Sequence, residues 1–148
     1  MSAVALSIRP IEVGEVGEVG ACFALMRQLR PRLASVDDLE ARWRRQAKGG
    51  YRAIAAGGEA RPLALAGFRV LENFVHGRYL YVDDLVVDEA ERGRGLGAAL
   101  IDWLKAEGKA LGCDNLVLDT ALANTAAQRF YRRQGLSDRA LRFSLALA

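Results

Sequence analysis

Glycine and arginine gather in one short stretch of the chain, Arg92–Gly97, which reads RGRGLG. Its three glycines let backbone N–H groups approach a ligand without a Cβ in the way. Apolar residues follow at helical spacing as far as Leu111, so the stretch opens a helix, and Gly112 marks its expected end. The first N–H groups of a helix lack internal partners and suit phosphate. Together with the arginines, they predict a site for a pyrophosphate-containing cofactor.

An acidic pair, Asp83 and Asp84, interrupts the apolar run Leu80–Val87 just before this stretch. The β-branched and aromatic residues of the run favour a strand. Neighbouring strand residues point to opposite faces unless a bulge intervenes, and bulges re-aim side chains beside active sites. The break that the two aspartates make in the strand pattern therefore favours a bulge at this position.

Two classes of cofactor fit the glycine-rich stretch. Gly93-x-Gly95-x-x-Ala98 matches a loose dinucleotide fingerprint, and Asp119 follows at the end of a predicted strand. That fingerprint should follow its strand directly, near the start of a βαβ series. Here Asp88–Glu91 intervene, and antiparallel strands are expected before them. A dinucleotide-binding fragment therefore stays open only as an alternative.

The stretch also resembles the Arg/Gln-x-x-Gly-x-Gly/Ala motif of the GNAT superfamily of N-acetyltransferases. A second segment, Asn124–Gly135 (NTAAQRFYRRQG), resembles the second signature of that family, an Asn followed by a helix that carries Phe-Tyr and ends at Gly. The resemblance implies an α/β fold with a mixed central sheet. Such a sheet is mostly antiparallel, has a parallel pair at the cofactor cleft, and is flanked by about four helices.

The resemblance further implies acetyl-CoA as co-substrate and no metal. In the family the glycine loop holds the pyrophosphate, the preceding strand pairs its backbone with the pantetheine arm, and the Asn of the second signature holds the same arm. Backbone N–H groups at the end of the strand are expected to polarise the carbonyl. The implied cofactor-binding residues are Leu85, Val86, Val87, Arg92, Gly93, Arg94, Gly95, Leu96, Gly97, Ala98, Asn124, Ala127 and Tyr131.

Catalytic roles follow from the same resemblance. A Tyr at the position of Tyr131 donates its proton to the CoA sulfur in the family; the alternative is a core aromatic beside Phe130. The segments LYVDDLVV and RFYRRQGLSD resemble diamine-type acetyltransferases, in which the first acidic residue binds or deprotonates the amine, often through water. That position is Asp83, and Asp84 is the second candidate. The alternative for both is a solvated or capping carboxylate.

The other elements expected from pattern surround these segments. Expected helices run through Phe23, Met26 and Leu29 and over Val36–Lys48, and the resemblance implies that the intervening Arg32, Leu33 and Ser35 border the acceptor site, an ordinary loop being the alternative. The expected strands are Val4–Arg9, ended by Pro10, then Tyr51–Ala56, Pro62–Glu72, Leu116–Leu118 and Leu141–Leu147. The family usually ends in two strands, so a partner subunit could complete the acceptor pocket.

Composition narrows the classes of partner. A chain of 148 residues suits a single domain over residues 1–148. The net charge of +3 is spread among acidic residues, which argues against a nucleic-acid partner. No apolar run approaches the roughly 20 residues of a membrane span, and no signal-peptide pattern opens the chain, so we expect no membrane partner and a cytoplasmic location. The edges of so short a sheet favour a homodimer.

We expect direct transfer of acetyl to a primary amine in a ternary complex, because no residue presents itself as a nucleophile for an acyl-enzyme. By the diamine-type resemblance, the expected acceptor is a small cationic amine. Protein N-termini or lysines are the alternative acceptors. A non-catalytic acyl-CoA-binding or regulatory domain is the alternative function.

Overall fold

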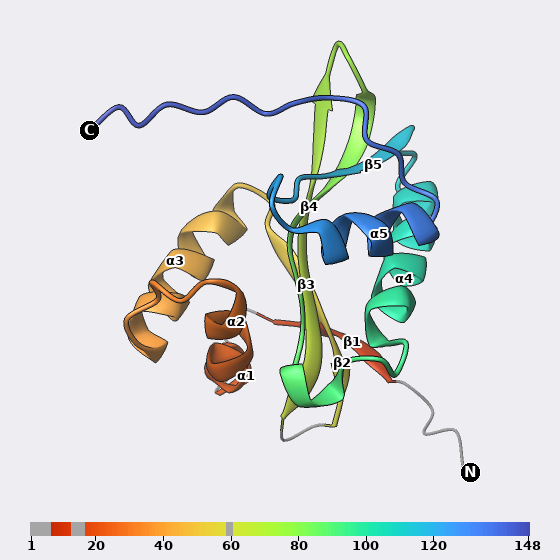
Figure 1. The fold of residues 1–148 in the computed structure, drawn as a ribbon. Coiled ribbons are helices and arrows are strands. Elements are labelled where there is room, and N and C mark those ends of the chain that lie inside the picture. Colours follow the sequence, from red (N-terminus) through yellow and green to blue (C-terminus); the bar gives the residue numbers. More distant parts are fainter. Residues whose placement is uncertain (1–6, 13–16, 59–60) are drawn as a thin grey trace. The chain divides into compact units, whose positions relative to one another are not determined.

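The computed structural model describes residues 7–12, 17–58 and 61–148 (Figure 1). The chain forms two compact units, Met1–Val117 and Leu118–Ala148. The first unit contains nearly all of the sheet and four of the helices among the described residues, and the second contains one helix and the C-terminal segment. Within the described residues, none of the helices combines the length and apolar character that crossing a membrane requires.

A five-stranded sheet forms the centre of the first unit. Its strands pair in chain order, antiparallel from β1 to β4, and β5 lies parallel to β4. This arrangement confirms the expected mixed sheet with one parallel pair. The strands are β1 (Ile8–Ile11), β2 (Arg52–Gly57), β3 (Pro62–Asn73), β4 (Gly77–Val87) and β5 (Asn115–Leu118).

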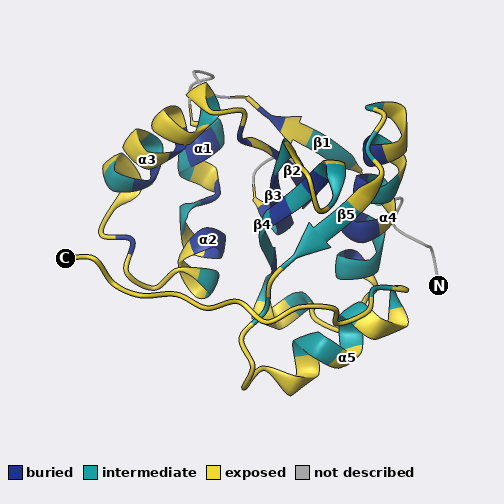
Figure 2. Cartoon of the chain, turned by 90° about the horizontal axis from the view of Figure 1, so that it is seen from above, coloured by how far each residue is buried: buried dark blue, intermediate teal, exposed yellow. Residues whose placement is uncertain are grey.

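Helices of the first unit cover both faces of this sheet (Figure 1). One face carries α1 (Glu18–Ala21), α2 (Phe23–Leu29) and α3 (Val36–Lys48), and the other carries α4 (Leu96–Ala110). Each side buries an apolar core, and Figure 2 shows the buried residues on the helix faces that turn toward the sheet. Fully buried side chains of this kind each contribute about 1.5–3 kcal/mol. The largest of them are Phe68, Ile54, Leu65, Leu80, Leu100, Ile101 and Leu104.

Local signals explain the helix ends. Ser35 caps α3, since its Oγ accepts the Asp38 N–H at 3.1 Å, and acidic residues in the first turn favour the helix dipole. The helix spans Val36–Lys48, as predicted from these residues. Gly112 follows α4 with a φ of 73°, a left-handed conformation that glycine adopts at helix ends.

The first strand differs from the prediction at its C-terminal end. Pro10 was expected to end it, but β1 continues to Ile11, and Pro10 lies opposite Ile54 of β2. Because β1 is an edge strand, it tolerates a residue without an N–H donor. The predicted start at Val4–Leu6 lies outside the described residues.

The second unit contains α5 (Thr125–Arg133) and a C-terminal segment without regular structure. The predicted strand Leu141–Leu147 is wrong: residues 136–148 form neither helix nor strand. Its apolar side chains alternate as in a strand, yet they are exposed, Phe143 at 89% (Figure 2). Alternation alone cannot form a strand, because the backbone groups also need a neighbouring strand to pair with.

Candidate active site

A bulge in β4 brings the two aspartates to one site. Gly67 of β3 lies opposite Asp84, whereas Phe68 lies opposite Val82, so Asp83 is the extra residue. The structure thus confirms the predicted bulge. Asp83 and Asp84, although adjacent in the strand, both line one pocket.

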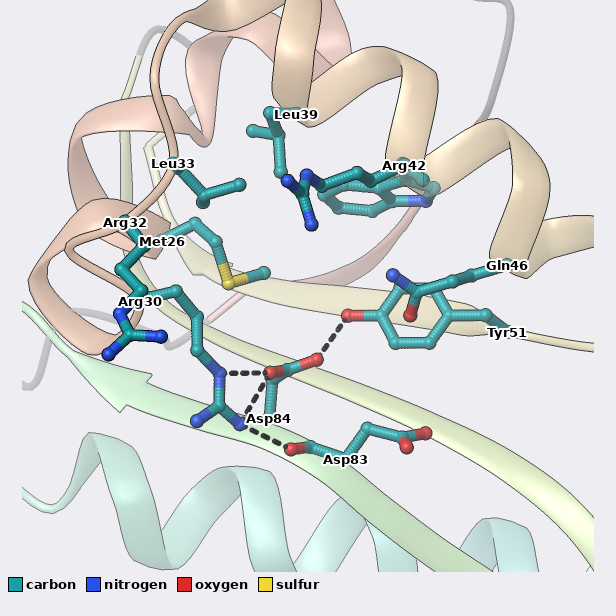
Figure 3. A pocket seen from close by; sticks show the side chains of 11 residues that line it. Met26, Arg30, Arg32, Leu33, Leu39, Arg42, Gln46, Tyr51, Asp83 and Asp84 are labelled. Atoms are coloured by element: carbon teal, nitrogen blue, oxygen red, sulfur yellow. Dashed lines mark hydrogen bonds and ion pairs between the residues drawn. The ribbon is translucent and has the colours of Figure 1, made fainter. Parts of the chain in front are cut away.

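The pocket has a volume of about 570 Å³ and lies within the first unit (Figure 3). It is formed by α2, the loop after α2, α3, the residue before β2, and the bulge of β4. Aromatic and apolar side chains share its wall with charged ones. The lining residues are Met26, Arg30, Arg32, Leu33, Leu39, Arg42, Trp43, Gln46, Tyr51, Asp83 and Asp84.

Asp84 is held by donors from two distant segments. Its Oδ1 accepts Arg30 Nε at 3.0 Å and lies 2.9 Å from Arg30 Nη2, and its Oδ2 accepts the Tyr51 hydroxyl at 2.9 Å (Figure 3). Arg30 Nη2 also donates to the backbone oxygen of Asp83 at 2.9 Å. Burial, and next the charge of Asp84, raise the pKa of Tyr51 well above its usual value, so its phenol stays a proton donor.

Tyr51 owes its position to Gly67. A Cβ at Gly67 would lie 1.8 Å from the Tyr51 hydroxyl oxygen, so only glycine leaves room for the phenol. Trp43 contacts the same ring edge-on at 5.6 Å between centroids. The sequence argument did not assign Tyr51, Trp43 or Gly67 to the site. A glycine in the middle of a strand, which often marks a close approach, was the signal that could have found this contact.

Asp83 has a different partner. Arg69 of β3 binds its carboxylate with two donors, Nη2 at 2.8 Å to Oδ1 and Nε at 2.9 Å to Oδ2. This hydrogen bonding raises the pKa of Arg69, which therefore stays charged. Asp83 thus lines the pocket with its charge balanced by a neighbouring strand. Arg32 and Leu33, expected to border the acceptor site, also line the pocket, whereas Ser35 serves as the cap of α3.

The glycine-rich stretch lies between β4 and α4. Leu85, Val86 and Val87 end β4, and Leu96, Gly97 and Ala98 form the first turn of α4. Gly93 and Gly95 have φ values of 84° and 80°, a backbone that side chains with a Cβ rarely adopt. Arg92 is exposed, and Arg94 pairs with Glu91. The left-handed turn and the helix end give the stretch the donor set that a pyrophosphate needs.

Three further predicted residues lie in the second unit, on or next to α5. Asn124 caps this helix, since its Oδ1 accepts the Ala127 N–H at 3.1 Å. Tyr131 is half-buried, its ring lies 5.3 Å from that of Phe130, and burial raises its pKa. The cap accounts for the Asn124 oxygen, while the roles of these residues toward a cofactor stay predictions.

Comparison with known proteins identifies the family. Residues 22–136 match the model of the acetyltransferase (GNAT) family. A glucosamine 6-phosphate N-acetyltransferase of Arabidopsis thaliana is 31% identical over 68 residues, which cover 46% of this chain and 44% of the relative. An aminoalkylphosphonate N-acetyltransferase of Salmonella typhimurium is 33% identical over 66 residues, covering 45% and 43%. The matched stretches therefore span less than half the length of these relatives.

Solved structures support the same assignment at the level of the fold. A putative acetyltransferase from Agrobacterium tumefaciens superposes with a TM-score of 0.81 at 21% identity, covering 95% of this chain and 99% of that chain. The family match spans most of the sheet, the pocket and both signatures found in the sequence. The chain therefore belongs to the acetyltransferase (GNAT) family.

Proposed function

We propose that this protein transfers the acetyl group of acetyl-CoA to the primary amine of a small molecule, an amine that is cationic in solution. The observation that carries the proposal is the course of β4 within the first unit. This strand runs from the aspartate bulge in the pocket through Leu85–Val87, and one short 3-10 turn, Glu89–Glu91, then leads to the glycine-rich turn. An acceptor site and a pyrophosphate site thus stand at two ends of one short segment.

The backbone at the end of β4 supports the proposed binding of the cofactor arm. The N–H of Asp114, next to β5, donates to the Arg78 oxygen at 2.6 Å, so β5 begins beside the start of β4. Since β5 has only four residues and runs parallel to β4, its pairing runs out before Leu85. Among the described residues, no further strand follows β5 on that side, so backbone groups of Leu85–Val87 are left for the pantetheine arm and for polarising the thioester carbonyl.

The proposed mechanism is direct transfer. Asp83, directly or through a water, takes the proton that the amine loses, and Asp84 contributes to holding the ammonium before that loss. The neutral amine nitrogen then forms the bond to the acetyl carbon as the C–S bond breaks, and the second N–H proton, which the amide no longer carries, passes to water, from which the Tyr131 phenolate regains its proton after the transfer. Tyr131 donates its phenolic proton to the leaving sulfur. Positioning and a general base can each supply a large share of such a rate enhancement.

The size of the pocket favours a small acceptor over a protein. A volume of about 570 Å³ is typical of small-molecule sites. The two relatives described above are named for small amines, glucosamine 6-phosphate and aminoalkylphosphonates. Protein N-termini and lysines are accordingly the second choice of acceptor.

Thermal unfolding with acetyl-CoA, CoA and NADH side by side tests the cofactor, because a ligand that binds only the folded state raises Tm. We expect both CoA ligands to raise Tm and NADH to leave it unchanged. Stabilisation by NADH alone, or by none of the three, would contradict the proposal. Release of free CoA thiol in the presence of an amine panel then separates an enzyme from a non-catalytic acyl-CoA-binding domain.

The proposal also includes a homodimer and a cytoplasmic location. Four exposed apolar side chains of the C-terminal segment support the dimer: Leu141, Phe143, Leu145 and Leu147. The free thiols of Cys22 and Cys113 suit a reducing compartment. Light scattering coupled to gel filtration should give twice the chain mass of 16.1 kDa, and cell fractionation tests the location.

A further inference from the structure

The acceptor pocket has more positive than negative side chains. Arg30, Arg32 and Arg42 line it together with Asp83 and Asp84. Each aspartate already forms an ion pair with an arginine. Asp84 pairs with Arg30 at 2.9 Å, and Asp83 pairs with Arg69 of the neighbouring strand at 2.8 Å. One guanidinium therefore balances the charge of each carboxylate, and the ammonium of an acceptor would share the carboxylates with these arginines.

The three arginines that line the pocket differ in their ion-pair partners. Arg42 is paired with Asp38, one turn earlier on α3, at 2.8 Å. Arg32 is exposed, and its side chain has no ion pair or hydrogen bond within the described part of the chain. Taken with their partners, the charged groups around the pocket leave one excess cation, and that cation is Arg32.

The loop that carries Arg32 is anchored on both sides. Arg30 before it is tied to Asp84, and Leu33 after it is buried at 8% exposure and donates its N–H to the Arg30 oxygen at 3.2 Å. The backbone of Arg32 is thus held at the pocket while its guanidinium stays available. Figure 3 shows Arg32 on the same side of the pocket as Arg30, with Arg42 reaching in from α3.

We propose that the acceptor amine carries an anionic group, phosphate, phosphonate or carboxylate, and that Arg32 binds this group while the amine lies at the aspartates. The inference rests on the proposed acetyl transfer. A guanidinium matches such anions with two parallel donors, and it is always charged. Arg42, which reaches into the pocket from α3, is placed to contact the same anionic group. An acceptor with an ammonium at one end and an anionic group at the other would then be oriented by both ends. The second ammonium of a diamine would instead be repelled by Arg32.

Calorimetric titration into the CoA-saturated protein tests the inference. The ligands are phosphoethanolamine and β-alanine as anionic amines, in which an anionic group accompanies the ammonium, ethanolamine, which carries the ammonium without an anionic group, and ethylenediamine, which carries a second amine. We expect at least about tenfold tighter binding of an anionic amine than of ethanolamine, as for one charge-assisted contact. Comparing phosphoethanolamine with β-alanine distinguishes phosphate from carboxylate as the anion recognised.

Two variants complete the test. Arg32→Gln should lose the preference for the anionic amines and keep the affinity for ethanolamine. Arg44→Gln, which removes the same charge from the exposed face of α3 outside the pocket lining, should keep the preference. Equal or tighter binding of ethanolamine or ethylenediamine, no measurable binding of either anionic amine, or an equal loss in Arg44→Gln would overturn the inference. Saturation with CoA is measured first, so a failure of the proposed function is recognised separately.

Discussion

The two neighbouring aspartates have different surroundings and so can have different tasks. Asp84 is tied to Arg30 and Tyr51, both of which line the pocket. Asp83 is tied to Arg69, which belongs to β3 and is not part of the lining. The ion pair could make Asp83 a structural residue of the bulge, or it could hold the carboxylate in place for the amine. Two substitutions distinguish a structural role of Asp83 from a role toward the amine.

Asp83→Asn should lower kcat/KM about a hundredfold, because the amine loses its proton acceptor and its charge partner. Arg69→Gln keeps the carboxylate and removes only its partner, so its loss should stay below about tenfold. Steady-state kinetics with one acceptor gives both values. Equal losses in the two variants would mean that Asp83 serves only the ion pair.

Tyr131→Phe should lower kcat about a hundredfold, since the leaving thiolate loses its proton donor. A general acid works while it is protonated, below its pKa, and fails above it. Burial raises the pKa of Tyr131, so the activity of the unsubstituted protein should not decline through ionisation of this phenol until the pH exceeds the ordinary tyrosine value of about 10. Tyr79→Phe, the same change in β4 near the hairpin turn, is the control and should keep the activity and its pH profile. A decline well below pH 10 that disappears in Tyr131→Phe would contradict the direction of the pKa shift.

At the scale of the elements, the bulge of β4 and the glycine of β3 act together. The bulge turns Asp84 toward the pocket, and Gly67 opposite it makes room for the phenol that binds Asp84. Both features serve one hydrogen bond, which joins Tyr51 and Asp84 across 33 positions of the sequence.

Gly67→Ala should destabilise the protein by about 1–3 kcal/mol, because the new Cβ would displace Tyr51 and break its bond to Asp84. Urea unfolding gives the change in the free energy of unfolding. Gly58→Ala is the matched control, since a Cβ there meets no atom within 4 Å. A Gly67→Ala protein as stable as the control would show that Tyr51 can move aside without cost.

Elements that depend on local signals could be predicted from the sequence, whereas contacts between distant segments could not. Helix α3 was predicted to the residue because its cap, Ser35, and its acidic first turn are local signals. The bulge at Asp83 and Asp84 was predictable because polar residues broke an apolar alternation. The partners of that bulge, Arg30, Tyr51 and Arg69, were not, since pairing between distant segments leaves no local pattern. The strand predicted over Leu141–Leu147 failed for the same reason: its alternation says nothing of a neighbour.

At the scale of the whole molecule, charge and burial set the working conditions. The net charge of +3 and the pI of about 9.1 favour the approach of an anionic cofactor, and this attraction weakens as salt is added.

Burial changes the pKa of one cysteine thiol. Cys22 is fully buried in the core on the face covered by α1, α2 and α3, and this burial raises the pKa of its thiol from 9.0 to about 11.

The buried thiol makes the stability of the fold depend on alkaline pH. Above pH 9 the thiol ionises in the unfolded chain while it stays neutral in the folded one, so the unfolded state binds fewer protons and the stability falls as pH rises from 9 to 11. The contribution of Cys22 to this loss should reach about 2 kcal/mol at pH 11. Urea unfolding across this range measures it. Cys22→Ala should decline less steeply, although its starting stability is lower, whereas Cys113→Ala keeps the buried thiol and should follow the unsubstituted protein. A decline in Cys22→Ala as steep as in the other two would assign the alkaline loss to groups other than this cysteine.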